Sequence, residues 1–455
     1  MNNHLDHYRI GVIGLGFVGL TLSVVLANNG FNVYGVDTDL NKVELIKNRK
    51  TPFYEEKIEY YLEKVVDDKL IVSTDYNVLR DTNIVFITVG TPSENNGSQR
   101  LDYVIEAVNR LSNVWKNIDS YRLLVVKSTV LPGTTRKLAK IMSDKTGLEI
   151  GRELGVVFNP EFLREGSAIE DMEKPSRIVI GCIDEKSCRI IRTLWEELYR
   201  RLNTEVKIRE MSLEEAELVK YASNIFLAMR ISYVNTIANI CEEIPNCDVN
   251  KVLEATGLDP RIGSHYLEPG LGYGGSCLPK DIKSFIWFSK NKLGYKPVLI
   301  ESIDKVNEKQ PYRALEYLIK EYGDLSDRVI GILGLAFKPN TDDIRESISL
   351  KIINKLLEMK SKIKVHDPKA MDNVKKIYGD KLVYCNNPID AIKDSDAVII
   401  ATAWREYRKL KPEDYLRLMR NPVVIDGRRI YDNYRDFVEK GVKFYAIGLS
   451  RKQCL

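Results

Sequence analysis

The chain is predicted to be an α/β protein with two Rossmann-like, doubly wound parallel-sheet domains joined by a long central helix and a helical middle domain. Three features predict this. Residues 9–37 join a β-branched run to a glycine-rich turn and an apolar helical stretch, residues 212–244 have helical periodicity without Gly or Pro, and strand-like runs resume at residue 328. Strands that alternate with helices are typical of parallel sheets, and the long helical interruption separates two of them.

The length of 455 residues fits about three domains. We place a first α/β domain at 1–208, a helical domain at 209–320 and a second α/β domain at 321–455. The first domain is expected to contain the strands GVIGLG, VYGVD, IVFITVG, LLVVKSTV, LGVVFNP and RIVIG.

The turn after the first predicted strand has the spacing of a dinucleotide-binding motif. Gly14 permits a tight strand-to-helix turn, Gly16 lets the backbone approach a pyrophosphate, and Gly19 lets the helix pack on the strand. Asp37 ends the second strand, where a carboxylate can bind both ribose hydroxyls and would repel a 2′-phosphate. The strand, the glycines, the helix and the acid occur in the expected order, so this pattern predicts NAD rather than NADP.

The central stretch from Ser212 to about Ile244 predicts one long helix, with Ser212 as its cap and acids in its first turn. Lys220 and Asn224 are four residues apart and share one face of this helix, so both can point into one cleft. The alternative is an ordinary solvated pair.

Cys277 lies in the glycine-rich segment GYGGSCLPKD, residues 272–281. A thiolate is a strong nucleophile, and nearby positive charge such as Lys280 lowers the pKa of a thiol. Asp281, four residues on, is near enough to act as a base. The segment therefore predicts a catalytic cysteine loop; a buried structural cysteine is the alternative.

The second α/β domain begins at RVIGILGLAFK and continues through KVHDP, AVIIATAW and VVIDGRRIYD. Gly331 and Gly334 are followed by Ala336 and Phe337, so the full glycine pattern is missing and a smaller nucleotide is favoured over a dinucleotide. A domain that binds nothing is the alternative. Basic residues near the predicted strand ends argue against it: Lys338, Arg345, Arg428 and Arg429.

The amino-acid composition limits the classes of binding partner that we expect. The 68 Lys and Arg nearly balance 64 Asp and Glu, which argues against nucleic acid or a membrane surface as the main partner. No run of 18 apolar residues and no signal-peptide pattern is present, so a cytoplasmic location is expected. Four scattered histidines have no metal-ligand spacing, so no metal is expected. Seven cysteines without CxxC pairs fit a reducing compartment, and the six besides Cys277 are expected to be core or surface thiols: Cys182, Cys188, Cys241, Cys247, Cys385 and Cys454.

Seven ordered motifs give the chain a resemblance to a known family over essentially its full length. They are GLGFVG (14–19), VGTP (89–92), STVLPGTT (128–135), NPEFLREGSAIED (159–171), LVKYASN (218–224), GYGGSCLPKD (272–281) and FKPNTDDIRES (337–347). The chain resembles the UDP-glucose/GDP-mannose dehydrogenase family of nucleotide-sugar 6-dehydrogenases. The resemblance implies an N-terminal NAD-binding domain, a central helix that carries a dimer interface, and a C-terminal UDP-binding domain. It also implies a homodimer or a larger homo-oligomer.

The resemblance further implies roles for individual motif residues. Cys277 resembles the nucleophile, Lys220 and Asp281 the pair that activates water, and Glu161 an acid or base, and Asn224 and Thr129 complete the implied catalytic set. The implied cofactor-binding residues are Gly14, Gly16, Val18, Gly19, Asp37, Lys42, Thr91, Thr129, Glu165, Lys280 and Arg345. The implied substrate-binding residues are Glu161, Phe162, Leu163, Arg164, Glu165, Lys220, Asn224, Arg261, Tyr266, Leu267, Glu268, Pro269, Gly270, Gly274, Lys338 and Arg428. Among these, Arg261 resembles a residue that reaches into the site of a neighbouring subunit.

The implied activity is an NAD-dependent, two-step, four-electron oxidation of UDP-glucose at C6 to UDP-glucuronate, through a thiohemiacetal and a thioester on cysteine. Leu278 also suits the GDP-mannose branch, whereas the REGSAI and PSRIVIG stretches favour the UDP-glucose branch. Ser276 stands where N-acetylmannosamine enzymes usually carry His, which makes them a poor fit. A non-catalytic nucleotide-sugar sensor is a further alternative.

Overall fold

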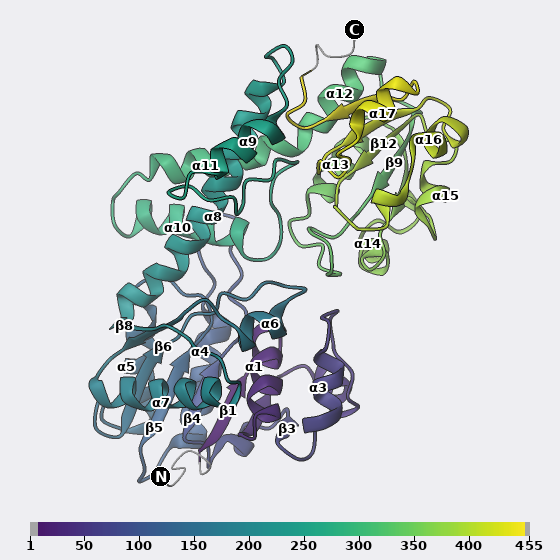
Figure 1. Ribbon diagram of the computed structural model, residues 1–455. Helices are drawn as coiled ribbons and strands as arrows, with labels where there is room; N and C mark the ends of the chain where they lie inside the picture. The colour runs from purple at the N-terminus through teal and green to yellow at the C-terminus, as the bar shows by residue number, and fades with distance from the viewer. Residues whose placement is uncertain (1–7, 451–455) are drawn as a thin grey trace. The chain divides into compact units, whose positions relative to one another are not determined.

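The computed structural model describes residues 8–450, which belong to two compact units, residues 1–223 and 224–455 (Figure 1). The N-terminal unit is built on an eight-stranded sheet of order β3-β2-β1-β4-β5-β6-β7-β8. Its strands are β1 (Arg9–Ile13), β2 (Asn32–Val36), β3 (Leu70–Ser73), β4 (Ile84–Ile87), β5 (Arg122–Val126), β6 (Leu154–Phe158), β7 (Ile178–Cys182) and β8 (Ile208–Ser212).

Helices cover both faces of this sheet. Alternate strand residues enter different cores, with Ile10 and Val12 on the face of one core and Ile13 on the other. The first face packs against α1 (Phe17–Asn28), α3 (Ile58–Val65), α6 (Ala168–Glu173) and α7 (Glu185–Arg201), and the second against α4 (Asp102–Trp115) and α5 (Thr134–Thr146). The short α2 (Leu40–Lys47) follows β2. The central strands β4, β5 and β6 are buried along their whole length because helices cover both faces, whereas the edge strand β8 is polar and largely exposed.

Helix α8 (Leu213–Cys241) is the long helix that the sequence predicts, and it runs from one unit into the other. Ser212 caps it: the Ser212 N–H donates to Glu215 Oε2 at 2.8 Å, and the Glu215 N–H donates back to Ser212 Oγ at 3.3 Å. The helices that follow are α9 (Val249–Gly257), α10 (Leu278–Asn291), α11 (Val298–Lys309) and α12 (Arg313–Tyr322).

The C-terminal unit contains a six-stranded, all-parallel sheet of order β11-β10-β9-β12-β13-β14, drawn in green to yellow in Figure 1. Its strands are β9 (Val329–Leu333), β10 (Lys362–His366), β11 (Val383–Tyr384), β12 (Ala397–Ile400), β13 (Val423–Asp426) and β14 (Lys443–Ala446). Its helices are α13 (Ile348–Glu358), α14 (Met371–Tyr378), α15 (Pro388–Ile392), α16 (Pro412–Leu418) and α17 (Tyr434–Glu439).

The predicted fold class is confirmed: two Rossmann-like sheets and a helical middle are present. Two strands depart from the expected parallel arrangement. β7 pairs with β6 antiparallel, and β8, which pairs with β7 parallel, therefore also runs opposite to the other six strands. The segment NPEFLREG lies in the connection between β6 and β7. The three domain boundaries predicted above stay a prediction.

The expectation that six cysteines are free thiols is wrong for four of them. Cys182 is bridged to Cys188, and Cys241 to Cys247, in each case across six residues with Cα atoms 5.5 Å apart. In both cases the chain turns back after a strand or a helix and brings cysteines six residues apart within disulfide range. The absence of CxxC pairs therefore did not rule out disulfides. Cys277 and Cys385 take part in neither of these two disulfides, and Cys454, like His4 and His7, lies outside the described residues.

Within residues 8–450, no helix is both long and apolar enough to cross a membrane. The cytoplasmic location stays a prediction.

Candidate functional site: a dinucleotide turn, a cysteine loop and a basic cavity

The turn between β1 and α1 has the backbone that a dinucleotide-binding loop needs. Gly14 has φ +94°, a left-handed conformation that favours glycine, and its N–H donates to the Val36 carbonyl at 2.7 Å. A Cβ at Gly19 would collide with the Gly14 carbonyl oxygen, so helix and strand approach more closely than any other residue allows. A Cβ at Gly16 would meet nothing within 4 Å, which leaves open space beside the backbone at the start of α1.

Asp37 stands at the end of β2 beside this turn. Its Oδ2 accepts from the Leu15 N–H at 2.7 Å and from Lys42 Nζ at 2.8 Å, and its Oδ1 accepts from the Asp39 N–H at 3.0 Å. A carboxylate has about four acceptor positions, so a ribose hydroxyl can still be accommodated. Together with the open helix N-terminus, where Val18 lies in the first turn, these residues fit an adenine dinucleotide.

Glu161 and Lys220 form a buried ion pair in the N-terminal unit. Lys220 Nζ donates to Glu161 Oε1 at 2.8 Å and to the Glu161 carbonyl at 2.7 Å, and the Leu163 N–H donates to Glu161 Oε2 at 2.6 Å. Burial raises the pKa of Glu161, but Lys220, the Leu163 N–H and Lys127 bring it below its ordinary value. The carboxylate is therefore ionised and can accept a proton.

The loop that carries Thr129 is tied down by polar contacts. The Thr129 carbonyl accepts from Thr91 Oγ1 at 2.8 Å and from Gln99 Nε2 at 2.6 Å. Farther along the same loop, Glu217 of α8 accepts from the Gly133 N–H at 2.6 Å and the Thr135 N–H at 2.7 Å, at the start of α5. Burial raises the pKa of Glu217 to about 7. These contacts hold Thr129 in place without involving its hydroxyl.

A cavity of about 290 Å³ lies behind the segment after β6. Its lining includes Lys127, Glu161, Phe162, Leu163 and Arg164. The Arg164 side chain is exposed and pairs with Asp171 at 2.6 Å. Glu165, which follows, is half-buried in the same segment.

Cys277 is exposed at the start of helix α10 in the C-terminal unit. Ser276 Oγ lies 3.6 Å from its Sγ. The carboxylate of Asp281, one turn into α10, is buried and accepts from Lys280 Nζ at 2.5 Å and from Asn224 Nδ2 at 2.6 Å. The structure thus brings Cys277, Asp281 and Asn224 together and gives Lys280 an ion pair with Asp281.

The glycine segment before Cys277 is anchored by Asn307 of α11. Asn307 Oδ1 accepts from the Tyr273 N–H at 2.8 Å, and its Nδ2 donates to the Tyr273 carbonyl at 2.9 Å. Gly274 lies against the Glu346 carbonyl, where a side chain would collide. These contacts fix the backbone that leads to the thiol.

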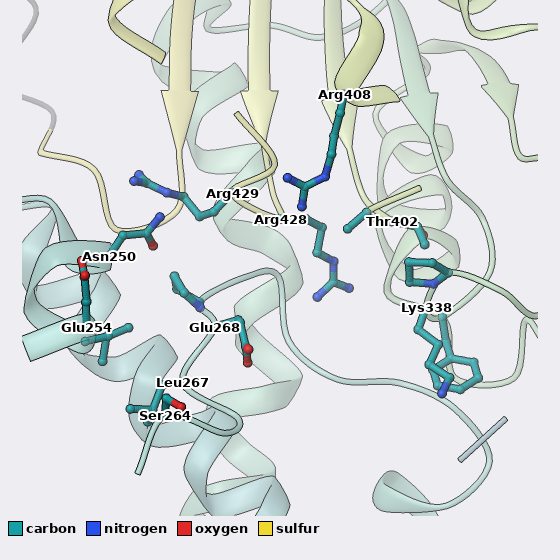
Figure 2. Close-up of a pocket in the computed structure, with 15 residues that line it drawn as sticks. Asn250, Glu254, Ser264, Leu267, Glu268, Lys338, Thr402, Arg408, Arg428 and Arg429 are labelled. Atoms are coloured by element: carbon teal, nitrogen blue, oxygen red, sulfur yellow. The ribbon is translucent and has the colours of Figure 1, made fainter. Parts of the chain in front are cut away.

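A larger cavity, of about 630 Å³, opens at the carboxyl ends of the C-terminal strands (Figure 2). Arg408 and Arg428 reach into it from loops after the strands, and Lys338 lies at its edge in Figure 2. The wall on the other side is formed by α9 and by the segment of Leu267, Glu268 and Pro269. Tyr266 and Gly270 flank this segment, and Tyr266 has φ +61°.

Arg428 is the most informative of the cavity residues. Its Nε donates to the Ala401 carbonyl at 2.7 Å and its Nη1 to the Gly272 carbonyl at 2.9 Å. Burial lowers the pKa of Arg428 to about 10, and within residues 8–450 no carboxylate forms an ion pair with it. A half-buried guanidinium held by neutral carbonyls is suited to an anion such as a phosphate.

Three other basic residues from the sequence predictions have carboxylate partners. Arg429 pairs with Asp248 at 2.6 Å and is largely buried, Arg345 pairs with Asp343 at 2.5 Å, and the highly exposed Arg261 pairs with Asp259 at 2.6 Å. Arg429 therefore supports the wall of the cavity through Asp248, the residue that caps α9.

Sequence reasoning missed four residues around these sites. Lys127 and Glu217 are buried beside the Glu161 pair and the Thr129 loop, Asn307 anchors the cysteine segment, and Arg408 lines the basic cavity. The Lys127-Ser128-Thr129 run directly after a strand was a usable signal for Lys127. Nothing local marks the other three.

Comparisons with known proteins agree with this arrangement. Residues 8–203 match the NAD binding domain of the UDP-glucose/GDP-mannose dehydrogenase family, 214–309 its central domain and 331–433 its UDP binding domain. The chain is 38% identical over 443 residues to the UDP-glucose 6-dehydrogenase TuaD of Bacillus subtilis, covering 97% of this chain and 93% of that protein.

Solved structures give the same result. A UDP-glucose dehydrogenase from the hyperthermophilic archaeon Pyrobaculum islandicum is 36% identical with a TM-score of 0.90, over 99% of this chain and 100% of that one. A UDP-D-ManNAc dehydrogenase from Pyrococcus horikoshii is 28% identical with a TM-score of 0.84, over 98% and 100%. These matches cover the glycine turn, the cysteine loop and the residues that line the basic cavity, and the chain belongs to the UDP-glucose/GDP-mannose dehydrogenase family and is an NAD-dependent dehydrogenase.

Proposed function

We propose that this enzyme oxidises UDP-glucose at C6 to UDP-glucuronate in two steps, with two NAD reduced per sugar. The observation that carries the proposal is the exposed Cys277 thiol at the start of α10, beside the buried Asp281–Asn224 pair. The names of the relatives, UDP-glucose 6-dehydrogenases over nearly the full length, support the choice of sugar.

The cofactor would be held by the Gly14–Gly19 turn and by Asp37 with Lys42, and the implied contacts of Val18, Thr91, Thr129, Glu165, Lys280 and Arg345 are part of the proposal. When bound, NAD supplies the acceptor for both hydrides. The basic cavity would hold the nucleotide: Lys338, Arg408 and Arg428 offer cations for a diphosphate.

Cys277 explains how an aldehyde is oxidised further without release. The first oxidation removes a hydride from C6 and a proton from its hydroxyl, which leaves an aldehyde. The thiolate then attacks the aldehyde carbon and forms a C–S bond, while the carbonyl oxygen takes up a proton. Loss of a second hydride and of the hydroxyl proton from this thiohemiacetal gives a thioester. The positive end of α10 favours the thiolate form of a thiol placed there.

Water then breaks the C–S bond, releasing the carboxylate and restoring the thiol. We assign the proton of this water to the Asp281 and Glu161 carboxylates. Lys220 and Asn224, one turn apart on α8, would stabilise the oxyanions that develop at C6. Each is already held by a carboxylate, so neither must be reoriented from solvent.

The remaining predicted site residues belong to the same proposal. We retain Phe162, Leu163, Arg164 and Glu165 as substrate-lining residues, with the segment from Tyr266 to Gly270 and Gly274, and Arg261 as a residue that acts in a neighbouring subunit. A dimer through α8 is supported by three half-exposed apolar side chains spaced seven residues apart, Phe226, Tyr233 and Ile240. Sedimentation of the purified protein would test it.

The test of the function begins with purified protein, NAD and a panel of UDP-glucose, GDP-mannose and N-acetylated UDP sugars. We expect NADH with UDP-glucose, at two per sugar. A different preferred sugar would move the chain to another branch, and no NADH with any sugar would favour a non-catalytic sensor.

The mechanism is tested by Cys277→Ser, with Cys385→Ser as the control at the other cysteine that takes part in neither disulfide. We expect the Cys277 variant to make at most one slow hydride transfer per site and to lose sustained turnover by about a thousandfold or more, while the control turns over normally. Formation of sugar acid at the wild-type rate by the Cys277 variant would refute the covalent route.

A further inference from the structure

Lys127 is a buried lysine directly after β5, at the carboxyl edge of the N-terminal sheet. Its ammonium lies 3.1 Å from Asn159 Oδ1, 3.3 Å from the Asn159 carbonyl and 3.4 Å from the Pro160 carbonyl. An ammonium has three N–H donors, so these three oxygens use all of them. A lysine so placed has no donor left for a ligand.

The oxygens that Lys127 binds belong to the two residues just before Glu161. Asn159 is itself fixed, because its Nδ2 donates to the Val179 carbonyl at 2.7 Å. The Glu161 carbonyl is bound by Lys220 in turn. Two lysines therefore hold three consecutive carbonyl groups, and the Glu161 carboxylate projects from the backbone they fix.

The same cluster contains two amines and one carboxylate. Lys127, Glu161 and Lys220 are each less than a tenth exposed. Burial lowers the pKa of Lys127 to about 7, with Lys220 acting in the same direction and Glu161 opposing. In return, the charge of Lys127 is among the causes that bring the pKa of Glu161 below its ordinary value. The ring of Trp195, with its centroid 5.3 Å from the ammonium, covers the cation on the α7 side.

We infer that Lys127 is a positioning residue for Glu161: it fixes the Asn159–Pro160 backbone and supplies the second cation that keeps the Glu161 carboxylate ionised. The inference rests on the proposed role of Glu161 as a proton acceptor. Lys127 itself contacts neither substrate nor cofactor in this account, and it acts through the orientation and charge of its neighbour.

The experiment compares Lys127→Met, which removes charge and donors, Lys127→Gln, which keeps a donor without charge, and Lys127→Arg, which keeps the charge. Lys140→Met, an exposed lysine on α5, is the control. The ionisation of Glu161 is followed by carbon-13 NMR of protein labelled at glutamate carboxyl carbons, with the signal assigned by Glu161→Gln. This titration requires no turnover, so its result stands whether or not the enzyme oxidises UDP-glucose.

We expect the Met and Gln variants to raise the pKa of Glu161 by about one unit or more, and the Arg variant and the control to leave it in place. In turnover assays with NAD and UDP-glucose, the Met and Gln variants should have a kcat about 10- to 100-fold lower than the wild type, with smaller changes in both KM values. The Lys127→Arg variant should retain most of the wild-type kcat. The Gln and Arg variants decide the matter if Met does not fold. An unmoved Glu161 pKa in a folded neutral variant would overturn the inference, as would equal losses of kcat in the Gln and Arg variants. Inactivity of the wild-type enzyme with every nucleotide sugar would instead refute the proposed function.

Discussion

The turns after the first strands of the two sheets have nearly the same backbone but different surroundings. Gly14 has φ +94° and Gly334 φ +98°, and each N–H donates to the last carbonyl of the neighbouring strand, at 2.7 Å to Val36 and 2.8 Å to His366. An aspartate follows each of those strands, Asp37 in one sheet and Asp367 in the other.

The two aspartates differ in the number of hydrogen bonds that their carboxylates already accept. Asp37 accepts from two backbone N–H groups and Lys42, whereas Asp367 accepts from five donors. These are the backbone N–H groups of Leu335, Ala336, Lys369 and Ala370 and the indole N–H of Trp404. A carboxylate with about four acceptor positions has nothing left for a ribose. The same strand-turn-strand plan therefore leaves acceptor positions open on the aspartate of one sheet and fills those of the aspartate in the other.

The comparison extends to the residues that follow each glycine. Ala336 and Pro339 stand two and five residues after Gly334, where Gly16 and Gly19 follow Gly14. The C-terminal sheet instead presents Arg408 and Arg428 from later strand ends. Under the proposed function, dinucleotide recognition is concentrated at the first turn of the N-terminal sheet, and nucleotide recognition in the C-terminal unit is distributed over several loops.

The largest effect should come from Asp367→Ala. Five donors would lose their acceptor in a buried site, so we expect about 3–5 kcal/mol less free energy of unfolding, with NAD affinity nearly unchanged. Calorimetric melting with Asp37→Ala as the matched variant measures this. An unchanged melting temperature of the Asp367→Ala variant together with weaker NAD binding would show that Asp367, and not only Asp37, acts in cofactor binding rather than in stability.

Arg428→Ala should act on binding in the opposite domain. Loss of a charge-assisted contact in the cavity is expected to weaken UDP-glucose about 10- to 100-fold and to leave NAD within about twofold. Isothermal titration of each ligand measures this, with the exposed Arg420→Ala as control. Equal weakening of both ligands would show that the two recognition regions are not separate.

The smallest effect is expected for Asp37→Ala, where one set of ribose hydrogen bonds is lost. NAD should bind about tenfold more weakly, while UDP-glucose binding stays the same. Titration against the exposed Asp119→Ala control measures it. Equal losses for the two ligands would argue against Asp37 as the ribose acceptor.

Local patterns were enough to predict much of the fold. Helix α8 was predictable because 29 residues without Gly or Pro begin with a Ser-x-x-Glu cap. The strand β11, of two residues, and the short β3 gave too little alternation to be seen. The antiparallel β7 could not be foreseen, because an apolar run has no direction until its partner is known.

The candidate site divides in the same way. The neighbouring residues in the chain were enough to predict Cys277, Asp37 and the glycines as site residues. Asp367 sits in a similar sequence context, and only its five contacts show that it is occupied. Lys127 lies 34 residues from Glu161, and no spacing in the sequence links the two; strand order brings them together.

The two disulfides make the choice of reductant in the buffer important. Thiol reductants, which protect a cysteine such as Cys277 from air oxidation, also attack disulfides, and this chain has one at the end of β7 (Cys182–Cys188) and one beyond α8 (Cys241–Cys247). The second disulfide lies next to Asp248, whose carboxylate holds Arg429 at the rim of the basic cavity. Kinetic constants should therefore be compared between preparations that contain the same reductant.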